Sequence, residues 1–217
     1  KRTMTRMEPT IAVGILDRVE AVNGVFREVV SVNGRDFPAG PFRAVPAGKN
    51  VTLLGSHGSS VLSPRLHCRI PGGTPFVLRD VVIGVAFHWE RKGEQVFRGD
   101  LALECREGLL SAVNEIPLEA YLESVVSSEM SPTAPPEFLK AHAILSRSWL
   151  LAMLERKAGR AAGVAGEKKT FSGAGTDGPA AEGGAVEIRR WYDREDHEDF
   201  DVCADDHCQR YQGIVGQ

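Results

Sequence analysis

Glu129 is the residue whose type and position most clearly suggest chemistry. It stands at the end of one predicted helix and just before a second, with Val125, Val126 and Met130 as apolar neighbours. Apolar neighbours and the negative end of a helix dipole both favour the protonated form of a carboxyl group. A protonated carboxyl group can give its proton to a leaving oxygen, so Glu129 is a candidate general acid. The alternative is a solvated carboxylate, because most glutamates are exposed.

Two cations follow on the second predicted helix. Lys140 and Arg147 are seven residues apart, so they share one face of that helix. A fixed cation can orient Glu129 or hold a carboxylate group of a substrate. We therefore expect Glu129 to line a groove within reach of Arg147 or Lys140. The alternative is a basic stripe that faces solvent, and His142 between the two cations is expected to pack or to form a hydrogen bond.

Four side chains near the end of the chain form an H-x5-C-x3-H-C pattern: His197, Cys203, His207 and Cys208. Two thiolates and two imidazoles are a complete tetrahedral ligand set for zinc, and a set without an open position indicates a structural ion. Such a clip would present Gln209 and Tyr211 to a substrate; the alternative is that either residue simply packs against the protein. A Cys203–Cys208 disulfide is the main alternative, which an oxidising compartment would favour, and unrelated surface residues are the second.

The elements that must position these residues divide the chain in two. Residues 10–116 hold runs rich in Val, Ile, Leu and Phe, punctuated by Gly and Pro, and these runs predict β-strands. Asn33-Gly34 and residues 106–108 are predicted hairpin turns. No predicted helix separates the strands, so we expect a mostly antiparallel sheet. The predicted strands lie in TIAVGIL, VFREVVSV, NVTLLG, PFVLRDVVIGVAFHWE, QVFRGDLALEC and LLSAVNEI.

Residues 117–217 are expected to form the helical part of the chain. Apolar residues at i, i+3, i+4 and i+7 predict a helix that begins near Pro117 and ends near Glu129. A second helix is predicted over 135–157, with Gly159 as its C-terminal cap. The expected fold class is therefore α+β: an antiparallel β-rich N-terminal region, two adjacent helices that carry the active site, and a Cys/His-rich tail.

A segment dominated by glycine and alanine follows the second predicted helix, over residues 159–185. It has too little apolar content to offset its own ordering entropy, so we expect a mobile loop. Limited proteolysis is expected to cut this loop first, at Lys168 or Lys169.

Composition narrows the class of protein. The chain has 217 residues, of which 42% are hydrophobic, so a packed core is expected. The net charge of −3 argues against nucleic acid as the main partner. No run is apolar and long enough to span a bilayer, and because the chain begins at Lys1 rather than Met, we expect a signal or anchor upstream. Cys68 and Cys105 are expected to be buried as small hydrophobic residues.

Three segments in the same order resemble the SpoIID family of sporulation and cell-wall proteins, which includes the LytB-type amidase enhancers. The segments are Ser128-Glu129-Met130, then Lys140-Ala141-His142-Ala143 with Arg147-Ser148-Trp149, and Asp201-Val202-Cys203 through Cys208-Gln209-Arg210-Tyr211-Gln212-Gly213. Family domains continue past the Gln-x-Tyr-x-Gly segment. We therefore expect residues 117–217 to be one truncated family domain with strands before it.

The resemblance implies a lytic transglycosylase of the cell envelope, outside the cytoplasm. Its implied substrate is a peptidoglycan glycan strand stripped of stem peptides, cut at the β-1,4 bond between N-acetylmuramic acid and N-acetylglucosamine. Glu129 would protonate the leaving oxygen and then take the proton of the muramic C6 hydroxyl as it attacks C1, which leaves a 1,6-anhydro end. The resemblance also implies Arg147 in the cleft and zinc bound by two cysteines and two histidines.

Two other classes of function stay open. The chain can be a non-catalytic glycan-binding module that stimulates a cell-wall amidase. It can also be a true hydrolase, because ordinary glycosidases use two carboxyl groups. Glu119, Glu123 and Asp205 are the candidates for the second carboxylate.

Overall fold

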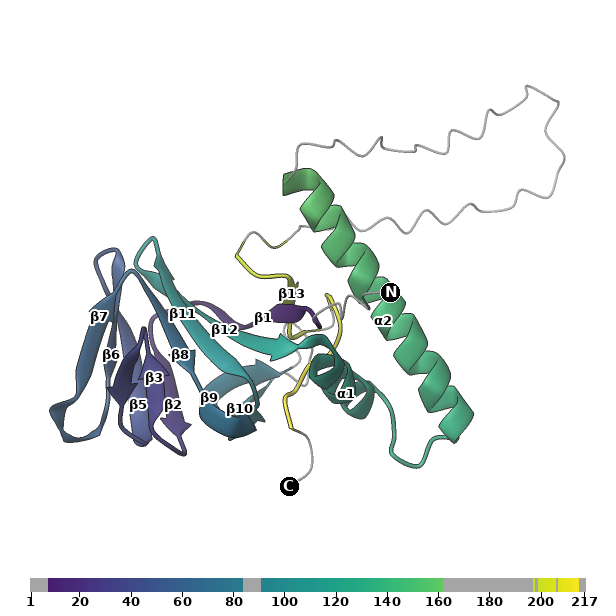
Figure 1. The fold of residues 1–217 in the computed structure, drawn as a ribbon, viewed down its shortest axis with the longest axis horizontal. Helices are drawn as coiled ribbons and strands as arrows, with labels where there is room; N and C mark the ends of the chain where they lie inside the picture. Colours follow the sequence, from purple (N-terminus) through teal and green to yellow (C-terminus); the bar gives the residue numbers. More distant parts are fainter. Residues whose placement is uncertain (1–7, 84–90, 162–196, 198, 206, 215–217) are drawn as a thin grey trace, which may run out of the picture.

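The computed structural model describes residues 8–83, 91–161, 197, 199–205 and 207–214. Within them, two β-sheets lie face to face and two helices lie at one end (Figure 1). The C-terminal segment, residues 199–205 and 207–214, returns to the edge of one sheet. This is the α+β fold, with an antiparallel β-rich N-terminal region, that the sequence predicts. Among the described strands, only the short pair β1–β13 is parallel.

The described strands form one sheet of seven and one of six. In spatial order the first sheet contains β13 (Val202–Cys203), β1 (Thr10–Val19), β12 (Leu109–Pro117), β11 (Asp100–Arg106), β8 (Arg65–Arg69), β3 (Val30–Val32) and β4 (Arg35–Phe37). The second contains β10 (Arg91–Phe97), β9 (Phe76–Ile83), β2 (Val22–Phe26), β5 (Gly40–Ala47), β6 (Asn50–Leu54) and β7 (Ser60–Ser63). Short 3-10 turns lie at Ser56–Gly58 and Pro71–Gly73.

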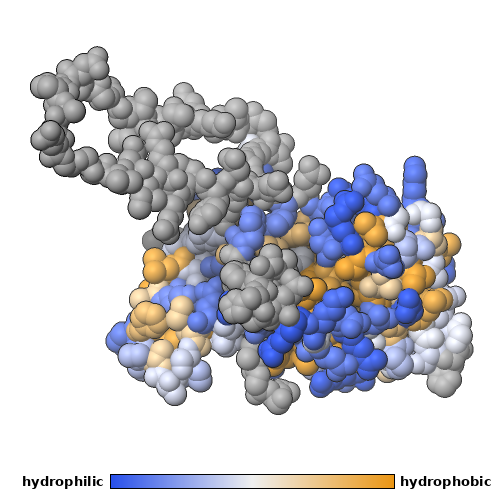
Figure 2. All heavy atoms as spheres, turned by 180° about the vertical axis from the view of Figure 1, so that it is seen from behind, coloured by the Kyte–Doolittle hydropathy of each residue, from blue (hydrophilic) through white to orange (hydrophobic). Residues whose placement is uncertain are grey.

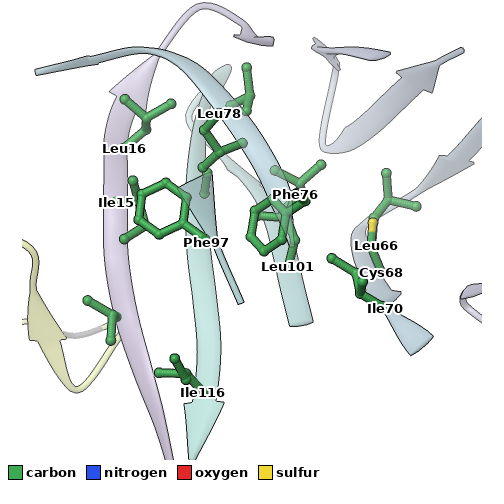
Figure 3. Packing of buried hydrophobic residues seen from close by; sticks show 14 of the residues in the cluster. Ile15, Leu16, Leu66, Cys68, Ile70, Phe76, Leu78, Phe97, Leu101 and Ile116 are labelled. Carbon is green, nitrogen blue, oxygen red and sulfur yellow. The ribbon is translucent and has the colours of Figure 1, made fainter. Parts of the chain in front are cut away.

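The hydrophobic core lies between the two sheets (Figure 3). Phe76 and Phe97 of the second sheet meet Ile15, Leu101 and other apolar side chains of the first, and all four are buried. Burying one such side chain contributes about 1.5–3 kcal/mol to folding. Because successive side chains of a strand point to opposite faces, this burial also fixes the register of each strand.

The two hairpins predicted from short turn sequences are confirmed. Asn33 and Gly34 have φ angles of 50° and 83°, and Glu107 and Gly108 have φ angles of 50° and 78°. Positive φ at both central residues is the pattern of a type I′ turn, whose twist matches that of the flanking strands. The Asn33 turn joins β3 to β4, and the Glu107 turn joins β11 to β12.

Five strands lie outside the predicted runs, namely β4, β5, β7, β8 and β13. Pro41 and Pro46 lie within β5, and Pro64 separates the two short strands β7 and β8. Proline removes a backbone donor and lowers the expectation of a strand. The run predicted as one strand over 25–32 is also two strands, because the chain crosses from the second sheet to the first after Phe26.

Both predicted helices are confirmed, and the second is longer than expected. Helix α1 is Leu118–Glu129, and Pro117 stands at its N-cap with φ −56° and ψ 144°. Helix α2 is Pro136–Ala161, so it continues through Gly159 instead of ending there. A glycine inside a helix costs only about 1 kcal/mol relative to alanine, which the rest of a long helix can offset.

Of the loop predicted over 159–185, the structure describes only 159–161, which belong to α2. The remainder, with the predicted cleavage sites Lys168 and Lys169, lies outside the described residues. Neither described helix combines the length and the apolar character needed to cross a membrane.

Candidate active site

Glu129 is the last residue of α1, and both of its carboxyl oxygens are held. Oε2 lies 2.8 Å from Nε2 of His142 on α2, and Oε1 accepts the backbone N–H of Arg210 at 3.0 Å. Met130 then leaves the helix in an extended conformation. The end of one helix, the start of the next and the C-terminal segment therefore meet at a single carboxyl group, whose side chain is 25% exposed.

The residues on either side of Arg210 are anchored in the interior. Gln209 accepts a hydrogen bond from the Tyr121 hydroxyl at 3.2 Å and donates one to the backbone oxygen of Ser146 at 3.3 Å. Tyr211 donates to Oδ1 of buried Asn114 at 2.6 Å. These two anchors fix the peptide between them, so the Arg210 N–H points at Glu129.

Gln209 and Tyr211 were expected either to face a substrate or to pack, and the structure buries both. Tyr211 is 1% exposed, and its ring stacks on that of Tyr121 with centroids 5.2 Å apart. Burial raises the pKa of Tyr121 and of Tyr211, with smaller effects on Tyr121 from the charges of Cys208 and Glu129. Both hydroxyls therefore stay protonated and serve as hydrogen-bond donors.

His142 is the closest side-chain partner of Glu129. Its side chain is 15% exposed, and Nε2 faces the carboxyl group. Its other ring nitrogen, Nδ1, is buried and has no hydrogen-bond partner among the described residues. The sequence predicted that His142 packs or forms a hydrogen bond, and the structure shows an ion-pair contact with Glu129. Its closeness to Glu129 was not predicted.

Lys140 and Arg147 do not contact Glu129. The Lys140 ammonium group lies 2.8 Å from the Glu137 carboxylate on the same helix, and Arg147 pairs with Glu119 of α1. The expectation that one of these cations reaches Glu129 is therefore wrong. The reason is the position of each residue on α2. His142 lies beside the last residue of α1, whereas Arg147 is further along α2 and lies beside Glu119 in the first turn of α1.

A groove of about 1030 Å³ runs between α1 and α2. Most of its lining is apolar, and Arg147 and Glu119 lie at its wall; Met130 lines it, whereas its neighbour Glu129 does not. Phe138 and Ile144 of α2 are exposed nearby. Figure 2 shows the molecule from behind, with scattered orange atoms among pale and blue ones at the end where the helices lie.

The four predicted zinc ligands come together. Their ligand atoms all lie within 4.8 Å of one another. Cys208 Sγ is 3.5 Å from Nε2 of His197 and from Nδ1 of His207, and Cys203 Sγ is 3.8 Å from Nδ1 of His207. All four cysteines of the chain are free, so the structure contains no Cys203–Cys208 disulfide.

The hydrogen bond with Cys208 is the largest of the effects that lower the pKa of Cys203 to about 3. A thiolate is the form of cysteine that binds metal, so this donor set fits a tetrahedral zinc ion. The cluster is attached to the sheet edge through β13, where Cys203 pairs with Gly14 of β1. The ring of Phe200 packs on His197, with centroids 4.5 Å apart. The same ring covers Gly14, where a Cβ atom would lie 2.6 Å from it, so only glycine fits at this position.

Sequence reasoning found Glu129 and the Cys/His cluster but missed three partners. They are His142, the Arg210 N–H and Tyr121, which all reach the site from separate elements. Local sequence patterns do not reveal these partners, because the contacts join segments that are far apart in the chain or depend on how the helices pack.

The comparisons with known proteins gave one match. The family model SpoIID, described as stage II sporulation protein, matches residues 106–217, which is just over half of the chain. This range contains β12, both helices, Glu129 and the Cys/His cluster. No curated protein and no solved structure matches the chain.

Proposed function

The chain belongs to the SpoIID family of stage II sporulation proteins, and from this premise we propose that it is a peptidoglycan lytic transglycosylase. It would cut the β-1,4 bond between N-acetylmuramic acid and N-acetylglucosamine in glycan strands that an amidase has stripped of stem peptides. Such strands lie outside the cytoplasm, so the protein would act in the cell envelope. The observation that carries the proposal is the double fixation of the Glu129 carboxyl group.

A transglycosylase of this kind needs one carboxyl group that first donates and then accepts a proton. Oε1 and Oε2 of Glu129 are held by Arg210 N–H and by His142, while a quarter of the side chain faces solvent. In our proposal Glu129 protonates the oxygen that leaves, then accepts the proton of the C6 hydroxyl as that oxygen attacks C1. His142 is then placed to hold the carboxylate that exists between the two transfers.

The other residues divide into two roles in this proposal. Arg147 lines the groove beside α1, and its exposed guanidinium would exchange Glu119 for a carboxylate or N-acetyl group of the glycan, with Lys140 further along the same helix. Gln209 and Tyr211 would act from the interior, by fixing the peptide that holds Glu129. A zinc ion held by His197, Cys203, His207 and Cys208 would serve as a structural link for this segment.

A second function has its own support. The groove between the helices is mostly apolar, and Phe138, Ile144 and Leu145 are exposed on α2. An exposed apolar surface of this kind is typical of a protein-binding site. A non-catalytic module that binds glycan and stimulates a cell-wall amidase is therefore the alternative.

Mass spectrometry of glycan strands after incubation with the protein separates these functions. Anhydro ends are expected from a transglycosylase. Reducing ends indicate a hydrolase with a second carboxylate among Glu119, Glu123 and Asp205, and intact strands indicate a binding module.

Substitution of Glu129 by Gln keeps the shape and removes the transferable proton. The rate is expected to fall by about 10² to 10⁴, the usual contribution of a general acid–base group. Glu155→Gln, at an exposed position on α2, is the matched control and should retain the rate. Near-normal cleavage by folded Glu129→Gln protein would exclude Glu129 as the acid.

A further inference from the structure

Three side chains with metal-binding atoms meet on the face of the seven-stranded sheet that points away from the core. His67 is on β8, Asp100 on β11 and Glu115 on β12. Nε2 of His67 lies 2.9 Å from Oε2 of Glu115 and 3.5 Å from Oδ2 of Asp100. The three atoms all lie within 4.8 Å of one another, and the three side chains are partly buried.

The sheet register forces the two carboxylates together. Asp100 is directly opposite Glu115 in the antiparallel pair of β11 and β12. Like charges at opposite positions destabilise a sheet. Glu104 is a third carboxylate in the group. Arg65 connects it to Glu115, because its guanidinium lies 3.0 Å from Glu104 and 3.2 Å from Glu115. One arginine for three carboxylates leaves an excess of two negative charges, which a divalent cation would neutralise.

The rest of each side chain is held by the scaffold. Oδ1 of Asp100 accepts the backbone N–H of Ile70 at 2.9 Å, and Oε1 of Glu115 accepts from Arg65 at 3.2 Å. Oδ2 and Oε2 are the oxygens that remain directed at His67. Partners of this kind, which orient the ligands of a site, are typical of metal centres.

The backbone of His67 is fixed as well. Its N–H donates to Oδ1 of Asn33 at 2.9 Å, and its carbonyl oxygen accepts the N–H of Asn33 at 3.0 Å. Asn33 belongs to the type I′ turn between β3 and β4. Both backbone polar groups of His67 are therefore hydrogen-bonded to the neighbouring hairpin, which fixes the position of the histidine in the site.

From this geometry we propose that His67, Asp100 and Glu115 bind a divalent metal ion of the zinc class. One imidazole nitrogen and two carboxylate oxygens are ligands that zinc takes readily, and three protein ligands leave a coordination position open for water or an anion. His67 and Asp100 lie outside residues 106–217, which the SpoIID family model matches. The site is separate from the Cys/His cluster and independent of the proposed catalytic role of Glu129. The alternative is a protonated His67 that forms ion pairs with both carboxylates.

Zinc binding to the chelator-treated protein tests the site. The double variant Cys203→Ser/Cys208→Ser removes the thiolates of the other cluster, so any zinc that it still binds belongs elsewhere. We expect it to bind one equivalent of zinc, and we expect His67→Gln in this background to abolish that equivalent. Glu104→Gln, which removes a charge of the same group but no proposed ligand, should leave the equivalent bound. No zinc on the folded double variant, or an unchanged equivalent after His67→Gln, would overturn the proposal.

Nuclear magnetic resonance of the histidine rings decides the question in the wild-type protein, even where a variant fails to fold. The Nε2 resonance of His67 is expected to shift on addition of zinc and to lose its response to mild acid once zinc is bound. A His67 ring that titrates with pH and does not respond to zinc would show the ion pair instead, and the metal site would be excluded.

Discussion

The C-terminal segment and the paired sheets are stabilised in different ways. Between them the sheets bury a continuous set of apolar side chains, including Phe76, Phe97 and Leu101. In the C-terminal segment, Phe200, Val202 and Tyr211 are buried, and the rest is held by hydrogen bonds and by the Cys/His cluster. The segment that fixes Glu129 therefore depends on polar contacts and a proposed ion, whereas the sheets depend on burial.

Removal of the proposed zinc is expected to give the largest difference in stability between the C-terminal segment and the sheets. The apparent binding free energy of structural zinc in small domains is about 10–16 kcal/mol, and it becomes part of local folding free energy. A chelator should therefore raise hydrogen exchange in residues 199–205 and 207–214, and leave β11 and β12 protected. Acid should act in the same direction, because thiols and imidazoles must lose their protons to bind.

Thiol labelling checks the same prediction by mass spectrometry. Cys203 and Cys208 should react only after chelation, whereas Cys68 should stay unlabelled in the folded protein. Cys68 is fully buried, and burial, with a smaller effect of the Asp100 charge, raises its pKa to about 12. Equal labelling of Cys203 before and after chelation would contradict the zinc clip.

Phe97→Ala should destabilise both regions at once. The ring is fully buried, 5.7 Å from that of Phe76 in the core and 5.9 Å from that of Tyr211 in the C-terminal segment. Truncation of a buried Phe typically costs about 3–5 kcal/mol of unfolding free energy. Denaturant titration measures the loss, and Leu62→Ala on exposed β7 should change the free energy by no more than about 0.5 kcal/mol. Equal effects of the two substitutions would show that Phe97 does not link the regions.

Tyr211→Phe should loosen the segment with a smaller effect on the sheets. The ring stacking remains, but the buried Oδ1 of Asn114 loses its donor at 2.6 Å. An unsatisfied buried polar atom costs about 1–3 kcal/mol. Denaturant titration should show that loss, and hydrogen exchange should place it in residues 207–214. A midpoint identical to that of the wild type would mean that this hydrogen bond contributes nothing.

Arg79→Ala should have the smallest effect of all. Arg79 of β9 lies 2.7 Å from Glu94 of β10, but both side chains are about half exposed or more. Exposed ion pairs contribute roughly 0–1 kcal/mol, because solvent and salt screen them. A loss above that range in a denaturant titration would show that surface charge, and not only burial, stabilises the second sheet.

Local sequence patterns predicted the elements that depend on neighbouring residues. The turn at Asn33-Gly34 and the helix from Leu118 to Glu129 follow from backbone preference and apolar spacing, which act over a few residues. The strands β5, β7 and β8 were missed, because proline lowers the local preference and pairing with distant strands overrides it. The predicted end of α2 at Gly159 was also wrong, because the helix continues to Ala161. The low helix propensity of one glycine is small compared with the stability of the rest of a long helix.

The sequence by itself determined that Glu129 ends a helix and that four zinc-type ligands lie on one short segment, because those relations are fixed by chain connectivity. Only the tertiary structure decided that His142, and not Lys140 or Arg147, reaches Glu129. It also brought His67 beside Glu115, 48 residues away, through the register of three strands. Such contacts depend on how separate elements pack, and packing is set by the burial of the whole apolar core rather than by the residues that meet.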